Sequence, residues 1–174
     1  RQWILEYVET MDKPANCLVV GISGGVDSAV VSTICAMTGM KTLVASMPIS
    51  QRPEHHDLSI KHKNWITTKY SNCYGVEIDL THTLSFENQM IDMKFKDEMG
   101  LANSRARMRM MCLYQLSAST SGIVVGTGNK IEDFGVGFYT KYGDGGVDIS
   151  PIADCTKTEV WAMAKELNIL EEIQ

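Results

Sequence analysis

The sequence lacks several features that would assign it to common classes of protein. Its five cysteines are an odd number, lie 18 or more residues apart and include no C-x-x-C pair, so neither a disulfide framework nor a zinc site is indicated. No apolar stretch approaches the roughly 20 residues that a membrane-spanning helix needs. The net charge of −5 leaves no excess of positive charge for general nucleic-acid binding. We therefore expect reduced cysteines in a cytoplasmic protein that binds neither membrane nor nucleic acid.

The composition that is present fits a single soluble domain over residues 1–174. Hydrophobic residues make up 44% of the chain and charged residues 21%, as in ordinary globular proteins, and the length suits one domain. The chain begins with Arg1 rather than Met, and no secretory apolar region follows it. Residues 170–174 break off within their pattern, so we expect this domain to be truncated at its C-terminus.

Apolar runs and helical periodicities alternate along the chain. We expect strands at residues 17–20, 42–47, 74–80 and 122–126, and helices at residues 1–11, 27–38, 54–69, 81–91, 103–119 and 156–167. The runs at 17–20 and 123–125 are apolar on both faces, which is typical of a covered parallel sheet. The pattern predicts an α/β fold with a doubly wound parallel sheet, a Rossmann-like three-layer sandwich. Ligands of such sheets bind outside the carboxyl ends of the strands.

A glycine-rich loop follows the first expected strand. Residues 21–28 read Gly-Ile-Ser-Gly-Gly-Val-Asp-Ser, and a helix is expected to begin with Asp27 or Ser28 as its cap. Gly24 and Gly25 allow a ligand to approach the backbone, and the free N–H groups of a helix start attract anions. Asp27 would repel phosphate unless a cation stood between them. The loop has no Lys and matches neither the Walker nor the dinucleotide-binding pattern.

The motif Ser-Gly-Gly-Val-Asp-Ser resembles the pyrophosphate loop of ATP pyrophosphatases, which cleave ATP to AMP and pyrophosphate while adenylating a substrate. That superfamily includes NAD synthetase, GMP synthetase, asparagine synthetase and tRNA-thiolating enzymes. The loop alone does not choose among them. The resemblance implies that ATP phosphates bind at Gly21, Ile22, Ser23, Gly24, Gly25, Val26, Asp27 and Ser28.

A second long segment follows the fourth expected strand. Residues 126–151 show little apolar periodicity but carry several acids together with Lys141 and the aromatic residues Phe138, Tyr139 and Tyr142. Loops of this length in compact domains are usually functional or disordered. Aromatic rings, acids and a lysine on a glycine-rich backbone suit a ligand with a ring, ribose hydroxyls and charge. Both this segment and the glycine loop would face the same crevice of the sheet.

Residues 137–146, Gly-Phe-Tyr-Thr-Lys-Tyr-Gly-Asp-Gly-Gly, together with the preceding Gly-Thr and Glu, closely resemble NAD synthetase of the ammonia-using type. The resemblance runs from about Val20 to Leu167. It implies that Asp27 and Glu132 ligate Mg²⁺, that Thr127 and Lys157 contact ATP, and that Asp27 and Lys157 are catalytic. It implies deamido-NAD contacts from Arg107, Lys141 and Asp148.

The reaction implied by this resemblance joins deamido-NAD and ammonia with cleavage of ATP. It gives NAD, AMP and pyrophosphate through an acyl-adenylate. The enzyme would be a ligase of NAD biosynthesis with Mg²⁺ as its metal. An anion that attacks a polyanion meets repulsion that cations must neutralise, and Mg²⁺ commonly takes one or two carboxylates plus substrate phosphates. No nucleophile from the protein is needed, because the substrate carboxylate and ammonia supply both attacks.

Three arginines of the expected helix at 103–119 point in different directions. At 100° per residue, Arg105 and Arg109 share a face and Arg107 points away from it. The rest of this helix is apolar almost all round, which predicts burial. A buried helix with one outward Arg suggests a subunit interface, and the resemblance implies a homodimer with deamido-NAD bound there.

Alternative interpretations accompany this one. Another adenylating ATP pyrophosphatase, similar to GMP synthetase, would share the loop at 21–28 but lacks the segment at 141–146. A non-catalytic nucleotide-binding module would have little need of both Asp27 and Glu132. Thr156 and Glu159 match a capping box, so Lys157 also has a purely structural interpretation as part of a helix start.

Overall fold

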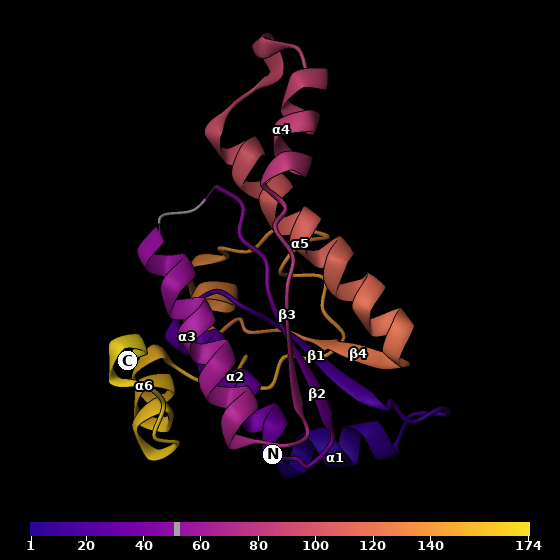
Figure 1. The fold of residues 1–174 in the computed structure, drawn as a ribbon, viewed down its shortest axis with the longest axis vertical. Helices are drawn as coiled ribbons and strands as arrows, with labels where there is room; N and C mark the ends of the chain where they lie inside the picture. Colours follow the sequence, from indigo (N-terminus) through magenta and orange to yellow (C-terminus); the bar gives the residue numbers. More distant parts are fainter. Residues whose placement is uncertain (51–52) are drawn as a thin grey trace.

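A parallel sheet of four strands lies at the centre of the chain (Figure 1). The computed structural model describes residues 1–50 and 53–174, and the side chains of all of these except residues 53–55 and 86–88. The strands stand in the order β3-β2-β1-β4, and every neighbouring pair is parallel. Their bounds are β1 Cys17–Ile22, β2 Lys41–Ser46, β3 Cys73–Glu77 and β4 Gly122–Val125.

Helices cover both faces of this sheet (Figure 1). On β1, Leu18 and Val20 pack into the core formed with α1, α2 and α6, whereas Val19 faces the core that includes Leu113 of α5. The predicted doubly wound α/β sandwich is therefore confirmed. The bounds are α1 Gln2–Glu9, α2 Val26–Ala36, α3 Pro53–Lys69, α4 Thr81–Met90, α5 Glu98–Thr120 and α6 Lys157–Glu166, with short helices η1 Met93–Phe95, η2 Ile131–Val136 and η3 Glu171–Ile173.

The strand order reverses direction between β1 and β4. The chain leaves β1 toward β2 and β3 and later returns to the other side of β1 as β4. Such a switch point opens a crevice at the carboxyl ends of the two strands. The glycine loop leaves β1 there, and the segment after β4 begins beside it. Gly126 N donates to Ile149 O at 2.8 Å, which brings the end of the long loop back beside β4.

Two predicted helix starts are wrong. Helix α2 is capped by Gly25 rather than by Asp27 or Ser28, because the Ser28 hydroxyl is used within the loop itself. Helix α5 begins at Glu98, five residues before the predicted start at 103. Its cap is Asp97, whose Oδ1 accepts a hydrogen bond from Gly100 N at 2.7 Å.

The expected burial of α5 is also wrong. Within this helix only Met110, Leu113 and Ser117 are buried. Met99 and Met111 are 62% and 61% exposed. The first turns of α5, together with α4, project beyond the sheet (Figure 1). One stripe of the helix therefore meets the strands, with Met108, Cys112 and Leu116 partly buried beside it, and apolar side chains such as Met99 and Met111 face outward.

Two predictions from composition concern the cysteines and the membrane. All five cysteines are free, in agreement with the absence of a disulfide framework. Burial raises the pKa of the Cys73 thiol to about 11, so this thiol stays protonated at neutral pH. Among the helices of residues 1–50 and 53–174, none has the length and apolar character needed to cross a membrane.

Candidate active site

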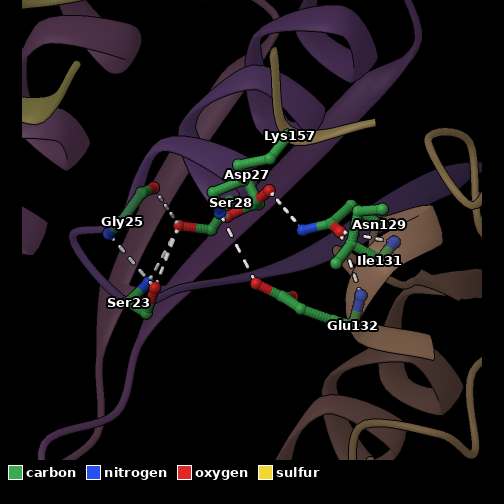
Figure 2. Close-up of polar contacts among 8 residues, drawn as sticks. All are labelled: Ser23, Gly25, Asp27, Ser28, Asn129, Ile131, Glu132 and Lys157. Carbon is green, nitrogen blue, oxygen red and sulfur yellow. Dashed lines mark hydrogen bonds and ion pairs between the residues drawn. The ribbon is translucent and has the colours of Figure 1, made fainter. Parts of the chain in front are cut away.

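The glycine loop is held in shape by two serine hydroxyls. Ser28 Oγ donates to Gly25 O at 2.9 Å and accepts from Ser23 N at 3.2 Å. Ser23 Oγ accepts from Gly25 N at 3.2 Å. Gly24 has a φ of +88°, a backbone conformation that favours glycine. These contacts wrap the loop around the start of α2 (Figure 2).

The buried residues of the predicted ATP loop can serve a ligand only through their backbone. Ile22 and Val26 are buried among apolar neighbours, and the Ser28 side chain is buried as well. Ser23 and Gly25 are exposed. The surface offered to an anion is therefore the backbone of the loop and the N-terminus of α2, whose dipole favours negative charge.

Asp27 lies in the first turn of α2, beside the glycine loop. Its Oδ1 accepts a hydrogen bond from Asn129 Nδ2 at 3.0 Å, and its Oδ2 forms an ion pair with Lys157 Nζ. The side chain is only 16% exposed. A carboxylate this buried requires compensating partners, and both of its oxygens have one.

Lys157 lies between the two carboxylates that the sequence predicts as metal ligands. Its Nζ contacts Asp27 and also Glu132 Oε1, the latter at 3.5 Å (Figure 2). Lys157 is the first residue of α6 and lies within the predicted capping box of Thr156 and Glu159, which is present. Capping and the contact with the carboxylates therefore coexist. Three predicted site residues from three separate segments meet at one point.

Asn129 is the residue of this site that the sequence prediction missed. It is completely buried. Its Nδ2 donates to Asp27, and its Oδ1 accepts from Ile131 N at 3.0 Å and from Glu132 N at 3.1 Å. An asparagine two residues after Thr127, at the end of a buried strand, was a usable signal. Asparagines are common in turns, however, and the pattern alone does not reveal the partner.

The donor set suits a hard cation. Asp27 and Glu132 supply carboxylate oxygens, which Mg²⁺ prefers, and they converge on one positive charge. Within the described part of the chain no three His, Cys, Asp or Glu side chains gather as a metal site. Two carboxylates with nucleotide phosphates as the remaining ligands are a usual arrangement for Mg²⁺.

Thr127 and Gly128 lie two and three residues after the end of β4, at the same edge of the sheet. Thr127 is half-buried. A Cβ atom on Gly128 would collide with Asp133 Oδ2, so no larger residue fits without moving the Asp133 carboxylate. Burial, with Asp144 and Glu132 nearby, raises the pKa of Asp133. The backbone here is thus packed closely around the acidic group.

The residues predicted to bind deamido-NAD form a second group along α5. Arg107 Nε donates to Lys141 O at 3.1 Å, so this predicted pair is adjacent. Asp148 Oδ2 accepts from Val124 N at 2.7 Å, and its Oδ1 accepts from Tyr114 Oη at 3.1 Å. Asp148 therefore fastens the loop to β4 and α5. Burial and Asp148 raise the pKa of Tyr114 to about 12.

The aromatic residues of the long loop are turned to solvent. Phe134 is 74% exposed, and Phe138 and Tyr142 are each 72% exposed. Lys141 Nζ lies over the Tyr142 ring, 5.0 Å from its centroid.

Arg109 Nε donates to Met47 O at 3.0 Å, on another side of α5 from Arg107, as the helical spacing predicts.

Comparison with known proteins places this geometry in one family. The family model described as NAD synthase matches residues 1–174. The NH(3)-dependent NAD(+) synthetase of Carboxydothermus hydrogenoformans is 38% identical over 173 residues, which cover 98% of this chain and 69% of that protein. The NH3-dependent NAD synthetase of Campylobacter jejuni, solved in complex with nitrate, has a TM-score of 0.85 at 30% identity, with 99% of this chain and 72% of that chain covered.

A further solved relative carries a different name. The NMN synthetase of Francisella tularensis has a TM-score of 0.85 at 28% identity, with 99% of this chain and 71% of that chain covered. The chain spans 58 to 69% of the length of the curated relatives that it matches.

Proposed function

We propose, from the premise that this chain belongs to the NAD synthase family, that it supplies the ATP-splitting centre of an ammonia-dependent NAD synthetase. The reaction is ATP + deamido-NAD + ammonia → NAD + AMP + pyrophosphate. The family match favours this acceptor over that of a GMP-synthetase-like enzyme, which shares only the glycine loop. The protein would act in the cytoplasm.

The observation that carries this proposal is the meeting of Asp27, Glu132 and Lys157 beside the glycine loop. Each residue comes from a different segment, and the three meet at the switch point of the sheet. A non-catalytic nucleotide module would gain little from two carboxylates around one cation at a phosphate site. An enzyme that cleaves a polyphosphate needs this concentration of charge.

In the first step a carboxylate oxygen of deamido-NAD attacks the α-phosphorus of ATP, and the bond to the pyrophosphate oxygen breaks. The backbone of the glycine loop and the start of α2 would stabilise the negative charge on the departing pyrophosphate. Asp27 and Glu132 would hold Mg²⁺, which when bound neutralises charge on the phosphate oxygens. Lys157 would then be free to donate to the phosphates.

In the second step the nitrogen of ammonia attacks the acyl carbon, a proton is lost from nitrogen, and AMP departs with the oxygen that joined it to the acyl group. The chain contributes positioning to this step. Burial of Asp27 shields this carboxylate from most of the surrounding water.

The acceptor would lie along α5, with Arg107 and Lys141 toward its charged groups and Asp148 holding the loop in place. The exposed apolar face of this helix, which includes Met99, Met111 and Tyr114, supports a homodimer that covers it. Family membership and this uncovered face together support the dimer.

A second candidate substrate is favoured by one comparison. The similarity to an NMN synthetase supports a second possible reaction, the amidation of the mononucleotide acid that corresponds to NMN. The ATP-splitting centre would be unchanged, because Asp27, Glu132 and Lys157 act on ATP and not on the adenylyl half of deamido-NAD. Competition between the two acids at limiting ATP distinguishes the candidates.

The proposal is tested by incubating the intact protein with ATP, Mg²⁺, ammonium and deamido-NAD. NAD, AMP and pyrophosphate should form in equal amounts. Omission of ATP or deamido-NAD should stop all three, whereas omission of ammonium should stop NAD formation and limit pyrophosphate to a single turnover. Formation of ADP, or AMP released without an acceptor at the same rate, would contradict it. A matched reaction with the mononucleotide acid in place of deamido-NAD shows which acceptor is preferred.

A further inference from the structure

The amide of Asn129 links the two carboxylates of the site. Nδ2 donates to Asp27 Oδ1 at 3.0 Å, while Oδ1 accepts from the backbone of Ile131 and Glu132. One side chain therefore fixes a carboxylate on α2 and the backbone that carries the other carboxylate (Figure 2). Asp27 and Asn129 are 102 positions apart in the chain, so the link joins the β1 and β4 sides of the crevice.

The environment of Asn129 makes this link rigid. The residue is completely buried, and an amide in such a place keeps its hydrogen bonds because water cannot replace them. The backbone around it is anchored as well, since Lys130 N donates to Cys155 O at 2.9 Å, two residues before Lys157. The segment with Glu132 and the segment with Lys157 are therefore tied to each other beside Asn129.

The bond to Asp27 leaves the metal-facing oxygen free of Asn129. Asn129 holds Oδ1, while Lys157 pairs with Oδ2. If Lys157 turns toward the phosphates of ATP, Asp27 loses one partner and keeps the other. Asn129 then prevents the carboxylate from rotating and keeps Oδ2 aimed at the cation. Such outer contacts orient ligands, and their loss commonly weakens metal binding about 10- to 100-fold.

We infer that Asn129 is a positioning residue that sets Asp27 and Glu132 at the separation a divalent cation requires. This inference rests on the proposed function. It predicts that Asn129 contributes to nucleotide binding chiefly when a metal is present, since its amide is buried and does not face the nucleotide.

The test measures how far Mg²⁺ improves binding of α,β-methylene-ATP, an analogue that this chemistry cannot cleave. Titration calorimetry with excess Mg²⁺ and with EDTA gives this metal-dependent gain for each protein. Asn129→Ala removes both halves of the link. Asn129→Ser shortens the side chain so that no donor reaches Asp27, but its hydroxyl oxygen can accept from the backbone N–H groups, which protects folding. Both variants should lose about ten-fold or more of the gain, with binding in EDTA changed less than about two-fold.

Asn72→Ala is the matched control. Asn72 Nδ2 donates to Ala36 O at 2.9 Å and to Met40 O at 2.7 Å, so this variant also removes an asparagine that bridges two segments. Asn72 lies at the amino ends of the strands, opposite to the site. The Asn72→Ala variant should therefore retain the full metal-dependent gain even if its melting temperature falls.

Three results would overturn the inference. Retention of the gain by Asn129→Ser within about two-fold would show that the donor to Asp27 does not matter. An equal loss with Mg²⁺ and with EDTA would show a purely structural role. Absence of any metal-dependent gain in the unmodified protein would instead defeat the proposed function, and the inference with it.

Discussion

Asp27 and Lys157 form an ion pair across 130 positions of the chain, between the first turn of α2 and the first residue of α6. The start of α2 is held by the Ser28 hydroxyl, which donates to Gly25 O, and the start of α6 is held by the Thr156 capping box. The pair therefore joins two ordered backbone segments at the crevice. Glu132 adds a second carboxylate to the same ammonium, so the centre carries one more negative charge than positive.

Loss of either carboxylate should stop turnover. Asp27→Asn and Glu132→Gln keep the approximate volume but remove the charge that would hold Mg²⁺, so we expect the rate of NAD formation to fall at least about 100-fold. The rate is measured by coupled detection of NAD. Asp12→Asn, at an exposed position after α1, is the control and should keep full activity. Near-normal activity of either site variant would remove its metal role.

Replacement of Lys157 should make stability depend more strongly on Mg²⁺. In Lys157→Met no positive charge stands between the carboxylates of Asp27 and Glu132, so they repel each other. Bound Mg²⁺ can supply that positive charge again. We expect Mg²⁺ to raise the melting temperature by about 2–4 °C more in the variant than in the unmodified protein. Calorimetric scans with Mg²⁺ and with EDTA measure this difference. An identical response of both proteins would mean that the metal does not take the place between the carboxylates.

Removal of Arg107 should weaken acceptor binding selectively. The Arg107 guanidinium is anchored to Lys141 O and stands apart from the ATP centre on α5. For Arg107→Ala we expect KM for deamido-NAD to rise about ten-fold, because a charged hydrogen bond is lost, with KM for ATP changed less than about two-fold. Initial rates at varied concentrations of each substrate provide both values. A parallel rise of both KM values would assign Arg107 a structural role instead.

A charge on the exposed face of α5 should keep the chain monomeric. Met111 is 61% exposed, and Met111→Glu places a carboxylate where the proposed dimer buries apolar surface. Light scattering after gel filtration should report a monomer for this variant and a dimer for the unmodified protein. Met37→Glu, which changes a 37% exposed methionine at the end of α2, should remain dimeric. A dimeric Met111→Glu protein would place the interface elsewhere.

Acid should destabilise the fold through His62. Burial lowers the pKa of His62 to about 4 from an ordinary value of 6.5, so the unfolded chain binds the proton more readily than the folded one. The contribution of neutral His62 to the free energy of unfolding is complete above pH 6.5 and is lost as the pH falls toward 4. The loss amounts to about 3 kcal/mol.

His62→Gln is the variant that isolates this effect. His62 Nε2 lies 2.8 Å from Ser32 Oγ, a contact that the amide of Gln can reproduce without a titrating group. Urea denaturation at a series of pH values should show a flatter profile between pH 6.5 and 4 for the variant. Equal slopes for the two proteins would show that another group controls the acid response.

Much of the fold was predictable because the strands are short, apolar runs and the start of α6 carries a clear capping box. The β1 run at 17–20 and the Thr156 capping box both lie where the pattern places them. The convergence of Asp27 and Glu132 followed from parallel topology, since both follow strand ends at one edge of the sheet. The burial of α5 was not predictable in this way, because periodicity does not reveal how far a helix extends beyond the sheet.

The remaining parts of the site depend on contacts between distant segments. Nothing in the neighbourhood of Asn129 in the sequence identifies Asp27 as its partner. Likewise, the resemblance to NAD synthetase implied that Asp148 contacts deamido-NAD, and the structure shows that its oxygens accept hydrogen bonds from Val124 N and Tyr114 Oη. Polar residues in long loops serve the fold and the ligand alike, and only three-dimensional placement separates the two roles.

The path of one oxygen atom tests the central claim most directly. Deamido-NAD with both oxygens of its nicotinate carboxylate replaced by a heavy isotope is converted with ATP and ammonium, and the products are examined by mass spectrometry. The account predicts one labelled oxygen in AMP, none in pyrophosphate, and one retained in the amide of NAD. Label in pyrophosphate, or unlabelled AMP formed together with NAD, would contradict an acyl-adenylate made at the Asp27, Glu132 and Lys157 centre.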